Sequence, residues 1–265
     1  MDQAGTLDGV DPSIAKSIVE SGLEDGAAPS DDKIGVSKVS LPAASLAPSQ
    51  TTMVLEKSLG MALGMLKSGK IGGDLGALIS KDKHILDGHH RWAATVLAAG
   101  RKGKVGGYMA SLPGGELLKV LNVVSKGAFG VRNGKAGKGS ISQFNPRNVQ
   151  EHLKQYTESG LKGDHPISAK GVQDILEDNF GSVEEGIETM SKNVKLMNLS
   201  VPSWAPDRAQ MPVIEPEQVP EAAHLLSEGK VDWTGPHKEA AVRLASCLPQ
   251  GSRERRELLR ALRSR

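Results

Sequence analysis

The sequence predicts an α+β fold, in which a small mixed sheet with packed helices is followed by a mostly helical C-terminal half. Two observations support this prediction. Between residues 34 and about 125, short apolar runs typical of strands alternate with segments whose apolar residues recur at helical spacing. From residue 146 onwards, helical patterns that open with good capping residues dominate the chain.

The first predicted strand covers residues 34–41, where apolar and polar residues alternate. Pro42 and Pro48 bracket a predicted loop. A helix is expected over residues 53–67, because leucines and alanines recur along one face. Either Thr51 or Thr52 is expected to cap this helix.

The end and the interior of this helix depend on glycines. Gly69 is expected to end it, since glycine tolerates the left-handed backbone found after helices. Gly60 and Gly64 lie inside it, and they either weaken the helix or let another element approach closely.

The same α+β pattern continues to residue 125. Lys81-Asp82-Lys83 is expected to form a turn between two short strands, although it lacks the glycine that tight hairpin turns prefer. The predicted elements are strands at 76–80 and 84–86, a helix ending at Gly100, a strand at 102–111 and a helix at 115–125.

The composition limits the classes of function. The chain has 265 residues, a net charge of +2 and only 3% aromatic residues, so any nucleic-acid-binding surface must be local. Cys247 is the only cysteine, which excludes an internal disulfide and a cysteine-based zinc site. No apolar run approaches the length of a membrane span, and the acidic N-terminus lacks a signal pattern. We therefore expect no membrane partner and a cytoplasmic location.

The most informative run is Ile85-Leu86-Asp87-Gly88-His89-His90-Arg91-Trp92-Ala93-Ala94. It predicts a strand, a tight turn and the start of a helix, with the polar groups gathered at the turn. The first turn of a helix presents free N–H groups and a partial positive charge, which suits an anion. The alternative is that Asp87 caps the helix and that His89, His90 and Arg91 are solvated.

This run belongs to a wider resemblance. The segment Leu46-Ala47-Pro48-Ser49-Gln50, a helix, and a strand pair that ends in Asp87-Gly88-His89-His90-Arg91 resemble the ParB/sulfiredoxin-like domain over residues 34–125. The resemblance implies a nucleotide-phosphate site at the turn, with CTP, ATP or ADP and Mg²⁺ as ligands.

Residues 88–91 match the motifs of the family's branches to different degrees. Gly88 and Arg91 match the Gly-Glu-Arg-Arg run of partition proteins. Gly88, His90 and Arg91 match the Gly-Cys-His-Arg run of sulfiredoxins, but His89 stands where the reactive cysteine would be, so sulfiredoxin chemistry is not expected. Members described as kinases or nucleases are closer by letter, but fold alone does not choose the reaction.

The residue types suit these roles. Arg91 would bind phosphate oxygens with its planar fork, and Gly88 would let the backbone approach them. His90 could donate to phosphate, and either His89 or His90 could transfer a proton.

Other polar groups would complete such a site. Asp87 could hold Mg²⁺ or orient a histidine, and Ser49 and Gln50 would add polar groups from the other side. A transition-metal site made of His84, His89, His90 and Asp87 is a weaker alternative, because the spacing fits no known site.

A glycine-rich basic loop is expected over residues 126–145. It fails the phosphate-loop pattern, because Gly139 is followed by Ser140 rather than by lysine. Arg132, Lys135 and Lys138 could contact DNA, RNA or nucleotide phosphates, and the alternative is a solvated loop.

The remaining ranges suggest contacts with other proteins. Residues 1–33 are expected to be an acidic tail or linker, 146–200 a helical region, 201–220 a proline-rich strap and 221–265 a small helical module. Within 146–200, Asn145, Ser168 and Ser182 are expected at the starts of helices. Partner binding or self-assembly through the tail, the strap and the terminal helices is one expectation.

Two functional hypotheses follow. The first is a nucleotide-binding ParB-like protein that acts near DNA, as a nucleotide triphosphatase, a phosphotransferase or a nuclease. The second is a structural or assembly protein, for example a phage particle component located in the virion, that keeps the fold without the chemistry. The intact motif at residues 87–91 favours the first, and the tail and the strap favour the second.

Overall fold

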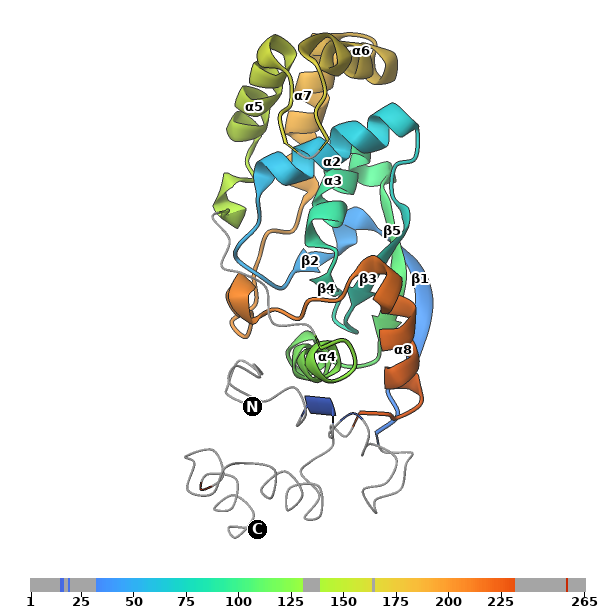
Figure 1. Cartoon of the computed structure of the whole chain (residues 1–265). Helices are drawn as coiled ribbons and strands as arrows, with labels where there is room; N and C mark the ends of the chain where they lie inside the picture. Colours follow the sequence, from blue (N-terminus) through green and yellow to red (C-terminus); the bar gives the residue numbers. More distant parts are fainter. Residues whose placement is uncertain are drawn as a thin grey trace.

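The computed structural model describes residues 15, 16, 19, 32–130, 139–163, 165–231 and 256. Within these residues the chain forms a mixed five-stranded sheet with helices on it, so the predicted α+β class is confirmed (Figure 1). No helix in the described part of the chain is long and apolar enough to cross a membrane.

The sheet has the strand order β1-β5-β3-β4-β2. Its strands are β1 (Val36–Pro42), β2 (Ala47–Pro48), β3 (Gly73–Ile79), β4 (His84–Asp87) and β5 (Lys104–Ala110). The pairs β1–β5 and β3–β4 are antiparallel, whereas β3–β5 and β2–β4 are parallel. The four longer strands were predicted. The loop expected between Pro42 and Pro48 instead contains a short helical turn and the two-residue strand β2.

The turn between β3 and β4 forms without a glycine. Lys83 supplies the left-handed backbone, with φ of 65°, and its N–H donates to the Ser80 carbonyl at 2.9 Å. Lysine adopts this conformation at some cost, because its Cβ crowds the backbone there.

The helices of the first half are α2 (Leu55–Ser68), α3 (His89–Ala99) and α4 (Gly114–Gly127). All three were predicted, and Gly69 ends α2 in the left-handed conformation as expected. The expected threonine cap of α2 is wrong. The helix begins beyond both threonines, with Val54 as its N-cap residue.

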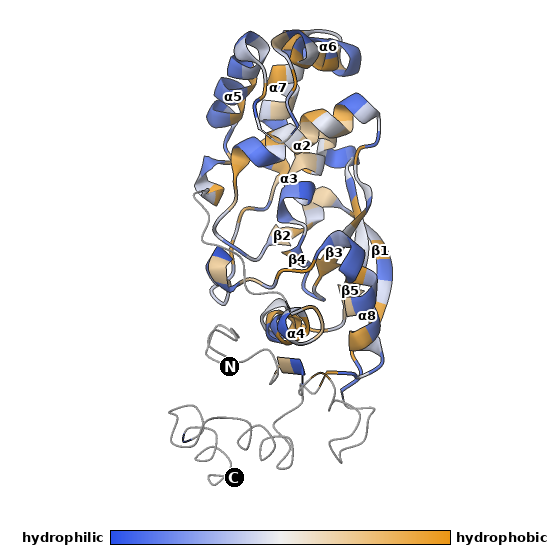
Figure 2. Ribbon diagram, in the orientation of Figure 1, coloured by the Kyte–Doolittle hydropathy of each residue, from blue (hydrophilic) through white to orange (hydrophobic). Residues whose placement is uncertain are grey.

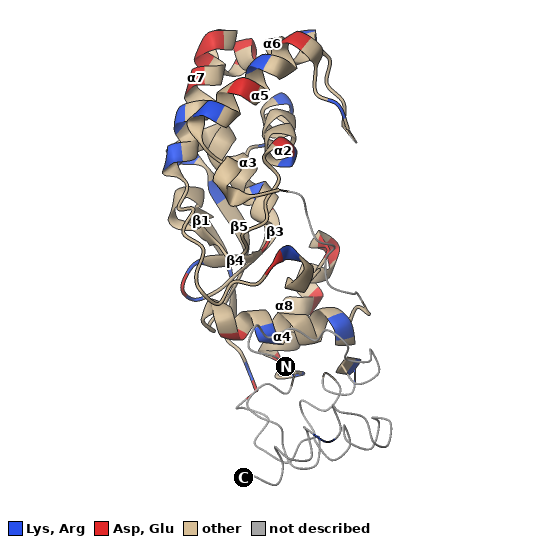
Figure 3. Cartoon of the chain, turned by 90° about the vertical axis from the view of Figure 1, so that its left-hand side faces the viewer, with Lys and Arg blue, Asp and Glu red and all other residues tan. Residues whose placement is uncertain are grey.

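The helices of the second half are α5 (Pro146–Ser159), α6 (Ala169–Phe180) and α7 (Val183–Asn193). The side chains of Asn145, Ser168 and Ser182 accept backbone N–H groups at their starts, as the sequence predicted. All three helices carry both hydrophobic and hydrophilic residues (Figure 2), and each buries apolar residues. Acidic residues are prominent on α6 and α7 (Figure 3).

The sheet contributes to two hydrophobic cores. The first joins the sheet to α2 and α3 and continues into α5, α6 and α7, with Trp92, Leu63 and Leu153 all fully buried in it. The second joins the sheet to α4, the strap and α8 (Val219–Ser227), through residues such as Leu86 and Leu121. The ranges expected to be separate therefore share cores with residues 34–125.

Several expected segments lie outside the described residues. These are most of the acidic tail at 1–33, residues 131–138 of the basic loop expected over 126–145, and the terminal module beyond Val231 except for Arg256. The strap, in contrast, is described in full and runs beside the sheet before it enters α8 (Figure 1).

Candidate functional site

The turn between β4 and α3 lines a cavity of about 210 Å³. Gly88 is the N-cap residue of α3 and has a φ of 96°, a conformation that favours glycine. A Cβ at this position would also lie 3.4 Å from Nη2 of Arg91. The motif residues Asp87, Gly88, His89, His90 and Arg91 all border the cavity, together with Gln50.

Asp87 and Arg91 form an ion pair at the edge of the cavity. Nη2 of Arg91 donates to Oδ2 of Asp87 at 2.7 Å, and the Arg91 and Asp87 side chains are 22% and 24% exposed, respectively. Burial raises the pKa of Asp87 above its usual value, although Arg91 and Arg208 act in the opposite direction. Nε of Arg91 is buried and has no hydrogen-bond partner within the described structure, so it is available to a ligand.

His89 is buried and accepts a hydrogen bond. The backbone N–H of Ser49 donates to Nε2 of His89 at 3.1 Å. Burial holds the pKa of His89 well below its usual value, and the nearby charges of His90, Arg208 and Arg91 act in the same direction. His89 is therefore neutral at pH 7 and fixes the segment that follows β2.

His90 has a similar role at the next position of the helix. The backbone N–H of Val54 donates to Nε2 of His90 at 3.1 Å. This contact satisfies one of the N–H groups that the start of α2 leaves without an intrahelical acceptor. Burial, helped by Lys57 and Arg208, lowers the pKa of His90 to about 4. His90 is thus neutral at pH 7, and its Nε2 is not free to act as a base while this contact holds.

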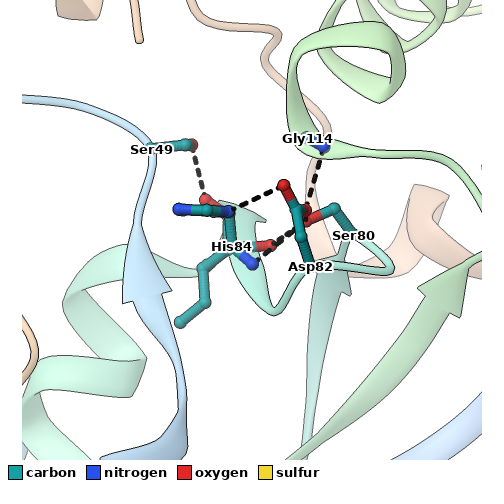
Figure 4. A network of polar contacts seen from close by, with 6 residues as sticks. Ser49, Ser80, Asp82, His84 and Gly114 are labelled. Atoms are coloured by element: carbon teal, nitrogen blue, oxygen red, sulfur yellow. Dashed lines mark hydrogen bonds and ion pairs between the residues drawn. The ribbon is translucent and has the colours of Figure 1, made fainter. Parts of the chain in front are cut away.

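Ser49 and Gln50 differ in their relation to the cavity. Ser49 is fully buried, and its hydroxyl donates to the carbonyl of Ile85 at 2.6 Å (Figure 4). Ser49 is not among the residues that border the cavity. Gln50 does border it, is only 2% exposed, and its Oε1 has no partner among the described residues. Of the two predicted residues, only Gln50 has unused hydrogen-bonding capacity at the site.

Sequence reasoning missed three charged residues of the cavity: Lys57 on α2, and Arg208 and Glu215 on the strap. Arg208 is the only arginine or lysine of residues 201–220, which is the one signal that could have drawn attention to it. No sequence pattern places the strap over this particular turn.

His84 belongs to a different cluster from the motif histidines. Its Nδ1 lies 3.3 Å from Oδ2 of Asp82, while the Ser80 hydroxyl and the Gly114 N–H both donate to Oδ1 of Asp82, at 2.5 and 3.0 Å (Figure 4). Asp82 thus joins the β3–β4 turn to the start of α4. The transition-metal site considered for His84, His89, His90 and Asp87 is not formed, because nowhere in the described chain do three or more His, Cys, Asp or Glu side chains converge on one position.

A magnesium ion is a different case, because Mg²⁺ in proteins is often held by one or two carboxylates plus the phosphates of a ligand. The two carboxylates that border the cavity are Asp87 and Glu215. These two residues are the ones at the cavity that could supply carboxylate oxygens to such an ion.

The predicted nucleic-acid contacts Arg132, Lys135 and Lys138 lie outside the described residues. The chain is described again from Gly139, where a Cβ would collide with the Met53 carbonyl oxygen. Next, the Ile141 N–H donates to the Thr51 carbonyl at 2.8 Å. Residues 139–141 therefore lie beside the segment that His89 and His90 hold.

The arrangement can bind an anion through Arg91, Arg208 and the start of α3, while its histidines serve as hydrogen-bond acceptors. Its volume is below the roughly 300–1,000 Å³ of sites that enclose whole drug-sized ligands. It therefore suits a phosphate group whose remaining attachments extend outside. Comparisons of the chain with family models, with curated proteins and with solved structures gave no match.

Proposed function

We propose that this chain binds the phosphate of a nucleotide in the cavity at the start of α3, as a ParB-like protein would. The observation that carries the proposal is Arg91, which borders the cavity with a buried Nε, unpartnered among the described residues, beside the helix N-terminus. A guanidinium and the first turn of a helix both favour phosphate oxygens. Because Gly88 has no side chain, a phosphate could approach the backbone closely at this turn.

The cavity favours certain chemical roles over others. His89 and His90 accept backbone N–H groups, so we assign them to positioning the segment at 49–54 rather than to proton transfer. Asp87 remains the carboxylate that could coordinate Mg²⁺ beside the phosphate or accept a proton from an attacking group. Hydrolysis or phosphoryl transfer at this site is an extension of the proposal that rests on the resemblance. An association with DNA through the basic loop is a second extension, and it rests on the basic residues Arg132, Lys135 and Lys138 of the sequence.

A second candidate is a structural or assembly protein that keeps the fold without the chemistry. The observation that favours it is the use of both motif histidines as fixed acceptors inside the fold. Under this hypothesis the Asp87–Arg91 pair serves only to hold the turn.

Calorimetric titration with CTP, ATP and ADP, with and without Mg²⁺, tests the proposal. We expect binding of at least one nucleotide, and an affinity about tenfold to a hundredfold lower for Arg91→Ala, because a hydrogen bond to a charged group contributes roughly 1.5–3 kcal/mol. Arg101→Ala is the matched control, since Arg101 is exposed and away from the cavity.

Thermal melting of both variants separates a loss of binding from a loss of folding. Absence of binding by the unmodified protein, or equal binding by Arg91→Ala, would leave the assembly hypothesis as the better account of the fold.

A further inference from the structure

Arg208 is the only arginine or lysine of the strap, residues 201–220, and it borders the cavity. It lies in a short helical turn, Arg208–Gln210, and is half-buried. Within the described part of the chain Arg208 forms no ion pair, in contrast to Arg91, which pairs with Asp87. Because Arg208 forms no ion pair within this part of the chain, its donors remain for another acceptor, although Asp87 is close enough for the charge of Arg208 to act on its pKa.

The strap holds Arg208 in place from both sides. Before it, Trp204 packs so closely on α4 that a Cβ on Gly114 would collide with the indole ring, and the ring also meets His84 edge-on at 5.3 Å. After it, the Asn122 side chain donates to the Gln210 carbonyl at 3.3 Å.

A further contact fixes the strap beyond Gln210. The Ser125 hydroxyl donates to the Val213 carbonyl at 2.8 Å, and the Val213 N–H lies 3.3 Å from the same hydroxyl oxygen. Because these contacts tie both flanks to α4, the strap forms a fixed wall of the cavity at Arg208.

The charged residues that border the cavity also favour an anion, because three are basic and two are acidic. Arg91, Arg208 and Lys57 face the carboxylates Asp87 and Glu215, and Asp87 is already engaged by Arg91. The positive charge of Arg208 is close enough to lower the pKa of His89 and of His90. Two guanidiniums that border one small cavity repel each other, and an anion bound between them would offset that repulsion.

We propose that Arg208 is a second anion-binding residue, and that the ligand's phosphate bridges Arg91 on α3 and Arg208 on the strap. The proposal rests on the proposed function, since it concerns the same cavity. It narrows the ligand to one whose anionic group offers oxygens on two sides, such as a terminal or bridging phosphate. It also makes the strap a component of the site.

Titrations with ADP, CTP and inorganic pyrophosphate test the role of Arg208. We expect Arg208→Ala to lower the affinity about tenfold to a hundredfold. Arg208→Lys should recover some of this loss, because lysine keeps the charge but not the planar fork. The control Arg101→Ala, which removes the same charge at an exposed position, should bind as the unmodified protein does.

Proteolysis gives a second readout that depends on the strap itself. Trypsin cleaves after arginine. A ligand whose phosphate binds Arg208 should slow cleavage of the Arg208–Ala209 bond in the unmodified protein. The same ligand should not slow this cleavage in Arg91→Ala. Cleavage after Arg147, which is exposed on α5, is the internal control and should not change with ligand.

The outcomes distinguish the two proposals. If the unmodified protein binds none of the three probes, the proposed function is overturned, and the role of Arg208 with it. If binding depends on Arg91 but Arg208→Ala binds with unchanged affinity, only the role of Arg208 is overturned. Loss of affinity in both variants, with protection of the Arg208–Ala209 bond, supports both.

Discussion

At the scale of single residues, the sequence predicted the position of the motif histidines but not their hydrogen-bond partners. The sequence correctly placed His89 and His90 at the start of a helix next to a strand. It could not show that backbone N–H groups of Ser49 and Val54 would occupy their Nε2 atoms, because those contacts join positions 40 and 36 residues apart. A histidine that accepts such a bond must be neutral at that nitrogen.

This neutrality makes stability depend on pH. The unfolded His90 takes up a proton near pH 6.5, whereas the folded one resists it until about pH 4. The unfolded state therefore binds more protons in this window, so stability is highest above pH 6.5 and falls as the pH is lowered. The contribution of His90 is at most about 3–4 kcal/mol, at about 1.4 kcal/mol per pKa unit.

Urea unfolding between pH 4 and 7 measures this slope in the unmodified protein and in His90→Gln, whose amide oxygen accepts the same N–H without titrating. The variant should show a shallower slope. His89 acts in the same direction as His90, while the raised pKa of Asp87 acts in the opposite direction, so some of the slope will remain. Identical slopes in both proteins would contradict the assignment of His90.

At the scale of elements, local signals were sufficient where the capping group lies in the same segment. Asn145, Ser168 and Ser182 bond to N–H groups three positions further on, and the sequence identified all of them. The predicted cap of α2 was wrong for the opposite reason. The N–H of Val54 at the start of this helix donates to His90, which belongs to α3 and is distant in the sequence. The site follows the same rule. The contiguous motif was predicted, whereas Lys57, Arg208 and Glu215 depend on tertiary packing.

The two glycines inside α2 give a test at this scale. A Cβ on Gly64 would have no atom within 4 Å, whereas a Cβ on Gly60 would lie 3.2 Å from Cδ2 of Leu161. Gly64→Ala should therefore raise the free energy of unfolding by about 0.5–1 kcal/mol, since alanine loses less backbone entropy in a helix.

Gly60→Ala should raise the free energy of unfolding by less than Gly64→Ala does, or should lower it, because Leu161 must move to make room for the methyl group. Chemical denaturation of both variants provides the comparison. A larger gain at Gly60 than at Gly64 would show that Leu161 does not pack on α2 as the structure has it.

At the scale of the whole molecule, the sheet contributes to two cores, and each core includes residues from regions that the sequence analysis had treated as separate. The strand pattern predicted a sheet between residues 34 and 125. The first core continues from this sheet through α2 and α3 into residues 146–199, and the second core includes residues 201–231. No local pattern carries this information, because amphipathic helices show which face is buried and not against what. The cavity borders both cores, since Met61 packs on the first and Leu86 belongs to the second.

Cores that share one sheet should unfold together. Leu153 of α5 and Leu121 of α4 are fully buried, one in each core. Replacing either with alanine removes apolar contacts and leaves a cavity, so each variant should lose about 2–5 kcal/mol of unfolding free energy. Circular dichroism and tryptophan fluorescence, with Trp92 in the first core and Trp204 packed against the second, should report coincident transitions in both variants. If Leu153→Ala melted the α5–α7 side while Trp204 kept its native signal, the two cores would be independent, and the cavity that borders both would not depend on the helices at 146–199.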